Sequence, residues 1–275
     1  MFEGQAAGEA VRKTMFYAKN DNLFSARKQI MGSTPTGQVQ QNKIATDDRI
    51  GKKVAAEELN VIARPSMTTY KGTTLVGSYP VDMEGTIPPG ELVLIENGML
   101  KTLLCGRVPT AKMTASNGHL RVPLTTPNPL IVPGVIEVDY KNSLTREDLK
   151  KKLLSLAQEE GLSYALIVRQ MTPNQSELRE VYKVDVTTGE ETLVRSASFK
   201  GLVLNDLRKL VGASNQKQVL NTTAGEDLQH KYEFLSGCPA TFITPDALLF
   251  KEIEVTKVVR TTVNKPPVVK NPLEL

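Results

Sequence analysis

The dipeptide Asn97-Gly98 constrains the fold more than any other feature, because it separates two short apolar runs. Residues 91–95 precede it and residues 99–104 follow it. A two-residue type I′ turn requires positive φ at both central positions, and Asn followed by Gly tolerates this requirement best. The pattern predicts a β-hairpin over residues 91–104.

A second hairpin is predicted around Thr188-Gly189, where residues 181–186 alternate between apolar and polar side chains and residues 191–194 follow the turn. This period of two is typical of a strand with one buried face. Strands joined by short turns pair in antiparallel fashion. Further strands are expected at residues 57–62, 73–76, 135–140, 164–168, 218–221, 240–244 and 248–259.

The clearest helix signal begins at Thr145, a favourable N-cap residue that Asp148 follows at the third helical position. Gly161 is placed to end this helix in a left-handed conformation. The buried stripe of the helix is predicted to consist of Leu149, Leu153 and Leu156.

Two other segments have weaker helical patterns. Residues 2–18 carry apolar side chains at helical spacing, and residues 204–211 are expected to form a short helix capped by Asn205. Residues 20–48 are polar and irregular, which indicates a long loop or lid.

A few helices among many strands predict an α+β fold with a large, mostly antiparallel, curved or barrel-like β-sheet. Residues 1–264 are expected to form one domain, and residues 265–275, which hold three prolines, an extended tail. The chain opens as if in the middle of an element, so we expect that a preceding region is missing. Any targeting signal would have gone with that region, so the sequence leaves two locations open, the cytoplasm or export from the cell.

Composition narrows the partners of this chain. A net charge of +4 over 275 residues is a mild bias and does not indicate nucleic-acid binding. No apolar run approaches the length of about 18 residues that a membrane-spanning helix needs. We therefore expect neither a nucleic acid nor a membrane as partner.

Histidine and cysteine are scarce, which limits any metal site. The chain holds His119, His230, Cys105 and Cys238, with no CxxC pair and no spacing typical of a metal site. We expect both cysteines to be buried thiols and His119 to lie on an exposed turn after Asn117-Gly118. A rearranged metal site made of the two histidines and Cys238 is the alternative.

Five segments, in this order, resemble the TldD/PmbA metallopeptidase family. These are Met1 to Glu9, Ile50-Gly51-Lys52-Lys53-Val54, Asp82-Met83-Glu84-Gly85-Thr86, the hairpin Leu94-Ile95-Glu96-Asn97-Gly98-Met99-Leu100-Lys101, and the run Arg107, Ala111, Ser116-Asn117-Gly118. The resemblance covers roughly the first half of the chain, and it implies that residues 1–264 are the C-terminal domain of such a protein.

The resemblance also implies a zinc site that this sequence has lost. Peptidases of this family hold zinc with the two histidines of an HExxxH helix and a later cysteine, and the glutamate activates the bound water. Here Phe2 and Ala7 stand in the two histidine positions, Glu3 in the glutamate position, and Cys238 is a possible third ligand. No catalytic zinc is expected, and Glu3 is expected to be inactive.

The chain therefore resembles a zinc-less, TldE-like or TldD-related member of the family. Such a subunit is expected to form a homodimer, or a heterodimer with an HExxxH-bearing relative, and to bind an unfolded or extended peptide at a sheet edge. The first alternative is an active peptidase with zinc in a rearranged site, and the second is a purely structural module.

Three further positions have two interpretations each. Glu3 is either a surviving base or a carboxylate near a helix start, where the helix dipole favours it. Asp82 and Glu84 either do acid–base work together or stabilise a turn. Asn117-Gly118 presents backbone N–H groups to a peptide or forms a plain tight turn.

Overall fold

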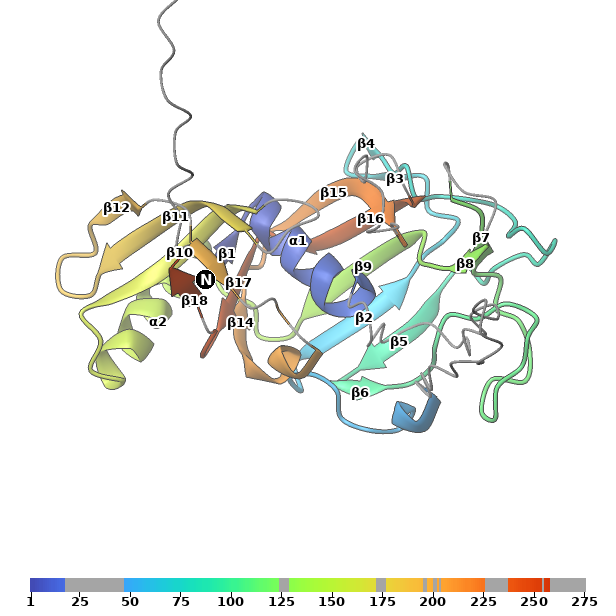
Figure 1. Ribbon diagram of the computed structural model, residues 1–275, viewed down its shortest axis with the longest axis horizontal. Coiled ribbons are helices and arrows are strands. Elements are labelled where there is room, and N and C mark those ends of the chain that lie inside the picture. The colour runs from blue at the N-terminus through green and yellow to red at the C-terminus, as the bar shows by residue number, and fades with distance from the viewer. Residues whose placement is uncertain are drawn as a thin grey trace, which may run out of the picture.

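The computed structural model describes residues 1–17, 47–123, 129–171, 177–194, 197–199, 202, 204–225, 237–253 and 255–257. Figure 1 shows two large sheets side by side, with helix α1 (Gln5–Arg12) lying across their junction. Helix α2 (Arg146–Glu159) packs on the sheet at one end of the molecule. Among the described helices, none is long and apolar enough to span a membrane.

The larger sheet has eight strands in the order β14-β17-β1-β10-β11-β13-β18, and β12 also pairs with β11. Every pairing in this sheet is antiparallel except that of β1 with β10. The strands are β1 (Phe2–Glu3), β10 (Tyr164–Met171), β11 (Glu177–Asp185), β12 (Glu191–Val194), β13 (Ala197–Phe199), β14 (Leu210–Ala213), β17 (Ala247–Phe250) and β18 (Val255–Lys257).

The second sheet has six strands in the order β15-β16-β9-β2-β5-β6, with β16 and β9 parallel. Two small hairpins, β3-β4 and β7-β8, complete the strands. Their bounds are β2 (Leu59–Ala63), β3 (Thr69–Tyr70), β4 (Thr73–Thr74), β5 (Leu92–Glu96), β6 (Met99–Leu100), β7 (Leu120–Arg121), β8 (Leu130–Ile131), β9 (Val135–Tyr140), β15 (Lys217–Ala224) and β16 (Cys238–Pro245).

The β5-β6 hairpin forms as its turn sequence predicts. Asn97 has φ of 51° and Gly98 has φ of 73°, which places both in the left-handed region. A Cβ atom at position 98 would lie 2.6 Å from the carbonyl oxygens of Ala55 and Ala56. Glycine is therefore required both for the turn and for the close approach of the neighbouring chain.

Helix α1 joins the two sheets. It packs against β1 and β10 of the larger sheet and β15 and β16 of the smaller one, and continues into a π-helical turn at Lys13–Tyr17. At Gly8, a Cβ atom would lie 2.9 Å from Leu220 Cδ2 and 3.1 Å from Leu220 Cβ. The absence of a side chain at this position lets α1 approach β15 closely.

Helix α2 begins and ends where the sequence predicts. The Thr145 hydroxyl accepts the Asp148 backbone N–H at 3.1 Å, and Gly161 follows the helix with φ of 69°. The buried stripe differs in one position, because Ala157 is buried where Leu156 was expected, and Leu156 is only half-buried.

The apolar core has one large and two smaller parts. The large part joins α1 to strands of both sheets, and includes residues from β1, β2, β5, β9, β10, β11, β16 and β17. A second part lies between α2 and the eight-stranded sheet. The third, centred on Leu75, Val135 and Ile243, covers the other face of the six-stranded sheet.

The predicted α+β class is confirmed, with few helices and large, mostly antiparallel sheets. Residues 2–3 are a strand rather than a helix start, and residues 101–104 do not extend β6. The described residues include 3₁₀-helices at Asp47–Arg49 and Leu204–Lys209, and Asn205 lies inside the second instead of capping a helix.

The single strand predicted over residues 248–259 is two strands, β17 and β18, which pair with different neighbours. The tail at residues 265–275, the domain boundary at 264, most of the 20–48 loop and His230 lie outside the described residues.

Candidate functional site

Strand β1 sends its two side chains to opposite faces of the eight-stranded sheet. Phe2 pairs with Val168 and Leu248, and all three belong to the large core around α1. Glu3 pairs with Ala247, which belongs to the core beneath α2. Because neighbouring residues of a strand alternate between faces, Glu3 points away from the face that carries α1.

Glu3 is buried and engaged by an arginine. The Glu3 side chain is 6% exposed, and its carboxylate accepts a hydrogen bond from Arg169 Nε at 2.9 Å. Arg169 Nη2 also donates to Glu191 at 2.7 Å, and Glu191 accepts from Lys150 at 2.6 Å. The Arg169 guanidinium lies 4.3 Å from the centre of the Tyr182 ring.

This network shifts the pKa values of Arg169 and Glu191. Partial burial opposes the charge of Arg169, but hydrogen bonds from it to Glu3 and Glu191 raise its pKa above the ordinary value. The hydrogen bond from Lys150, with that from Arg169, holds the pKa of Glu191 below its ordinary value. Glu3 therefore belongs to an ion-pair network on β1, and no sequence signal for Arg169 as its partner was available.

The side chains at the three positions that the family resemblance assigns to zinc ligands, Phe2, Ala7 and Cys238, lie in the large apolar core. Phe2 packs edge-to-face on Phe250, with ring centroids 5.7 Å apart, and Ala7 on α1 has no exposed surface. Cys238, at the start of β16, is fully buried as predicted, and burial raises the pKa of its thiol to about 11. The reactive and metal-binding form of cysteine is the thiolate, which this environment disfavours.

His119 is buried, which corrects its expected place on an exposed turn. Asn117 draws this loop inward, because its side chain accepts from Cys105 N at 2.8 Å and donates to Leu103 O at 2.7 Å. His119 Nδ1 lies 2.8 Å from the Asn117 carbonyl oxygen, whereas Nε2 has no hydrogen-bond partner among the described residues. Burial lowers the pKa of His119 to about 4.

Arg121 links this loop to Cys238. Its guanidinium lies 4.5 Å from the centre of the Tyr79 ring, and Nη1 donates to the carbonyl oxygens of Pro133 at 2.8 Å and Pro239 at 2.6 Å. Sequence reasoning did not identify Arg121, because a lone arginine in a proline-rich stretch carries no motif.

The two carboxylates of the Asp82-Met83-Glu84 segment hold different loops. Asp82 Oδ1 accepts the N–H groups of Glu84 at 2.9 Å and Thr86 at 2.8 Å, which supports the turn-stabilising interpretation. Glu84 Oε2 accepts the Arg107 backbone N–H at 2.7 Å. The carboxylate of Glu84 thus joins the turn after Asp82 to the loop at Gly106 and Arg107.

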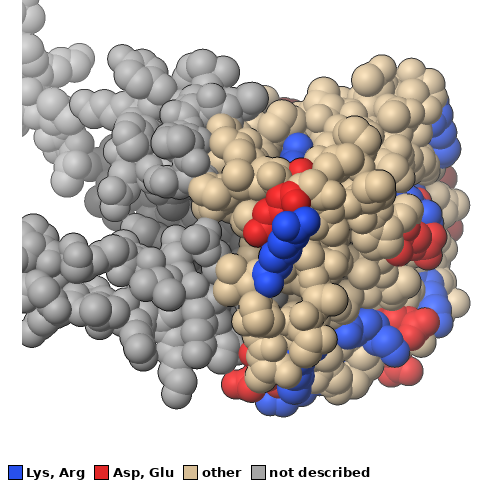
Figure 2. All heavy atoms as spheres, turned by 90° about the vertical axis from the view of Figure 1, so that its right-hand side faces the viewer, with Lys and Arg blue, Asp and Glu red and all other residues tan. Residues whose placement is uncertain are grey.

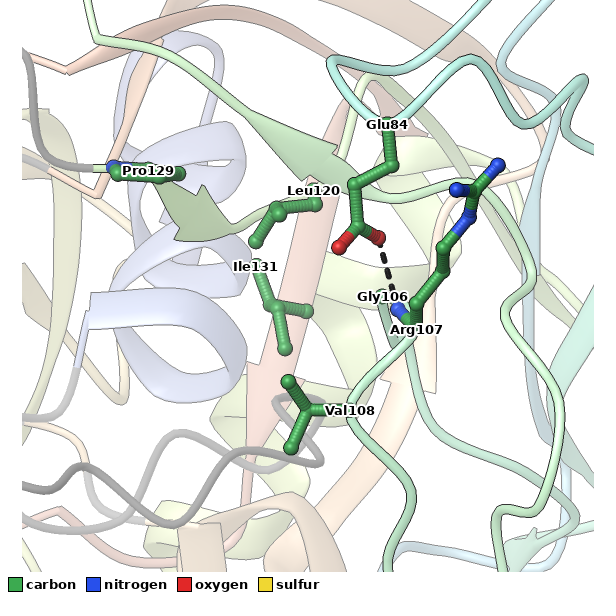
Figure 3. A pocket seen from close by; sticks show the side chains of 7 residues that line it. All are labelled: Glu84, Gly106, Arg107, Val108, Leu120, Pro129 and Ile131. Atoms are coloured by element: carbon green, nitrogen blue, oxygen red, sulfur yellow. Dashed lines mark hydrogen bonds between the residues drawn. The ribbon is translucent and has the colours of Figure 1, made fainter.

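A small pocket opens beside Glu84, with a cavity volume of about 60 Å³. Figure 3 shows its lining, which consists of Glu84, Gly106, Arg107, Val108, Leu120, Pro129 and Ile131. Most of the lining is apolar, and the two charged residues in it are Glu84 and Arg107.

Strand β15 forms one edge of the six-stranded sheet, where the Thr223 carbonyl oxygen accepts a hydrogen bond from Arg12 Nη1 at 3.3 Å. Thr241, opposite Asn221 in the register, donates its N–H to Gly134 O at 2.8 Å on the β9 side, and not to β15. Since hydrogen-bonded and non-bonded pairs alternate in antiparallel sheets, Asn221 and Val219 direct their backbone N–H and C=O groups away from β16. No described strand pairs with this side of β15.

Comparison with known protein families settles the resemblance. Residues 24–257 match the family model described as the PmbA/TldA metallopeptidase C-terminal domain. This chain belongs to the PmbA/TldA metallopeptidase family. The family predicted from the motifs is thereby confirmed. No curated protein sequence matched the chain.

One of the similar solved structures, that of a TldE protein, shares the fold of this chain. TldE from Thermococcus kodakarensis superposes with a TM-score of 0.58 at 16% identity, covering 93% of this chain. A putative modulator of a DNA gyrase from Thermotoga maritima gives a TM-score of 0.48 at 18% identity, covering 76% of this chain and 41% of that one. The present chain spans 49% of the length of the TldE chain.

The zinc of the PmbA/TldA metallopeptidases does not fit the residues at these positions. A catalytic zinc site takes three protein ligands with nitrogen, sulfur or oxygen donors. The side chains of Phe2 and Ala7 provide no donor atom, and Cys238 is a buried thiol. Within the described parts of the chain, no three His, Cys, Asp or Glu residues lie close enough to hold a metal ion.

Proposed function

We propose that this member of the PmbA/TldA family is a non-catalytic subunit that binds extended peptides and completes a proteolytic dimer. The observation that carries the proposal is the state of Glu3. A general base must reach a metal-bound water, but Glu3 is buried, ion-paired to Arg169, and directed away from the face where Phe2 and Ala7 lie. The catalytic residues therefore come from an HExxxH-bearing partner subunit.

The position of β15 at the edge of its sheet supports peptide binding. This strand is eight residues long, against four residues or fewer for β6, β12, β14 and β18 at the other edges of the two large sheets. An extended peptide that adds to such an edge gains main-chain hydrogen bonds whatever its sequence. A subunit that collects unfolded segments for a catalytic partner requires this kind of recognition.

Metal analysis and peptidase assays test the non-catalytic role. The purified complete protein is expected to contain no stoichiometric zinc and to leave unfolded peptides intact on its own. Adding the HExxxH-bearing relative is expected to produce chelator-sensitive cleavage. Stoichiometric zinc with chelator-sensitive cleavage by this protein alone would instead establish an active peptidase with a rearranged site.

Substitution of Val219 by proline tests the β15 edge. Proline removes the outward N–H of this residue, and edge strands tolerate proline where the N–H is not used within the sheet. Fluorescence anisotropy with a labelled unfolded peptide should show loss of binding for Val219→Pro. The matched variant Val219→Ala removes most of the same side chain, keeps the N–H, and should retain binding. Equal binding by both variants would exclude this edge.

A further inference from the structure

We infer that the pocket beside Glu84 selects a lysine or arginine side chain of the bound peptide. This inference rests on the proposed peptide-binding function and adds a substrate class to it. A long cationic side chain has an apolar stem and a charged end. The pocket presents mostly apolar walls with the Glu84 carboxylate, and Arg107 is the other charged residue in its lining.

The Glu84 carboxylate is held in place by two loops. The backbone N–H of Glu84 donates to Asp82 Oδ1, and the Glu84 Oε2 atom accepts the Arg107 N–H, so both the backbone and the carboxylate of Glu84 are fixed. Gly106 leaves room for the carboxylate, since a Cβ atom there would lie 2.9 Å from Glu84 Oε2 and 3.2 Å from Leu120 Cβ. Oxygen Oε1 accepts no hydrogen bond from any described residue.

The geometry favours a cation over an anion. In Figure 3 the Glu84 carboxylate points toward Leu120 and Gly106, whereas the Arg107 guanidinium extends along the outer side of Glu84, away from Ile131. An incoming ammonium or guanidinium group therefore meets a free carboxylate oxygen. A charge-assisted hydrogen bond in partly dry surroundings is stronger than its neutral counterpart.

The pocket has the size and the surroundings for the end of a long side chain. A volume of about 60 Å³ holds several water-sized groups. Met83 and Val108 beside the pocket are 49% and 68% exposed, and Ile87 in the same loop as Met83 is 75% exposed. Figure 2 shows acidic and basic groups among uncharged residues at this end of the molecule. Apolar neighbours of the basic residue would find contacts at the exposed Met83, Val108 and Ile87 side chains.

The pocket lies within reach of a peptide on β15. A Cβ atom at Gly225, the residue directly after β15, would lie 2.7 Å from Val132 Cγ1 and 2.9 Å from Leu130 Cδ1. The neighbouring residue Ile131 lines the pocket, so one strand, β8, separates the end of β15 from it. At about 3.3 Å per residue, a few additional residues of an extended peptide span this distance.

The test uses two short unstructured peptides, labelled with a fluorophore, that differ only in a central Lys or Gln between Leu and Val. The complete protein should bind the Lys peptide about tenfold more tightly, as expected for one charge-assisted hydrogen bond. Glu84→Gln keeps an oxygen for the Arg107 N–H but removes the charge, and should abolish this preference. Glu96→Gln, which removes a carboxylate from β5, should retain it.

Gly106→Ala provides an independent check that keeps the net charge, because it displaces the Glu84 carboxylate. It should reduce the preference for Lys without a loss of folding, as verified by circular dichroism. Equal affinity of the wild-type protein for both peptides would overturn the inference and leave peptide binding intact. Failure to bind either peptide would overturn the proposed function itself. A preference for Lys that persists in Glu84→Gln would place the subsite elsewhere.

Discussion

At the scale of single residues, the pair of Glu3 and Arg169 decides how the opening segment of this chain is interpreted. In an HExxxH helix the glutamate faces the metal together with the histidines. In this structure Glu3 and Phe2, which the resemblance places at the first two positions of that motif, lie on a strand and point to opposite sheet faces. The Glu3 carboxylate is part of a charged network with Arg169, Glu191 and Lys150.

Arg169→Met is expected to lower the free energy of unfolding by about 2 kcal/mol, since it leaves the buried Glu3 carboxylate without its partner. Because the Arg169 side chain is 35% exposed, solvent reduces the loss below that of a fully buried pair. Urea denaturation measures the change. The double variant Glu3→Gln, Arg169→Met should recover part of the stability, and no recovery would show that the pair is not coupled.

The buried imidazole of His119 is expected to make the stability of the protein depend on pH. The pKa of His119 is about 4 in the folded protein, against an ordinary value of 6.5, which serves for the unfolded chain, so the folded state holds the neutral form. As the pH falls below 6.5, the unfolded state binds a proton that the folded state does not, and stability is lost until the pH reaches about 4. This difference in pKa corresponds to a loss of up to about 3 kcal/mol in the free energy of unfolding.

Thermal unfolding of the wild type and of His119→Gln between pH 7 and pH 4 measures this effect. Carboxylates titrate in both proteins, so the difference between the two curves isolates the histidine. The wild type should lose more stability than the variant across this range. Parallel curves would contradict the buried, neutral state of His119.

At the scale of elements, some helices and strands form because of their local sequence, and others form because of tertiary contacts. The β5-β6 hairpin and helix α2 follow from Asn97-Gly98, Thr145 and Gly161, whose conformational preferences act over a few residues. Strand β1 has only two residues and forms because β10 and β17 flank it. No local pattern predicts a strand whose partners lie more than 160 residues away.

The close packing of α1 on β15 yields a prediction at this scale. Gly8→Val is expected to destabilise the protein by about 2 kcal/mol, because the added side chain would lie closer to Leu220 than van der Waals contact allows. Leu220→Ala in the same chain opens space for the valine. The double variant should therefore be more stable than the sum of the two single losses implies, as measured by urea denaturation.

At the scale of the whole molecule, one core connects both sheets through α1. Phe242 on β16 and Phe2 on β1 belong to this same core, although they lie in different sheets. The described residues therefore do not divide into two independent hydrophobic cores, one for each sheet. The fold of this chain is a joined pair of sheets, with the peptide-binding edge proposed for β15 at the side of the smaller one.

Phe242→Ala is expected to lower the free energy of unfolding by about 3–5 kcal/mol and to destabilise both sheets together. Hydrogen exchange followed by mass spectrometry should show faster exchange in β10 and β11 as well as in β9 and β16. Confinement of the effect to the six-stranded sheet would indicate that the two sheets unfold separately. A conservative Phe242→Leu change should produce the same pattern with a smaller amplitude.

The sequence by itself determined the α+β class, both hairpin turns, the caps of α2 and the family, because these depend on local conformational preference and on ordered motifs. It also determined that Phe2 and Ala7 provide no donor atoms for zinc. Only the tertiary structure decided that Glu3 faces Arg169, that His119 is buried, and that Glu84 lines a pocket close to β15. These features are set by contacts between segments far apart in the chain, and such contacts leave no periodic pattern in the sequence.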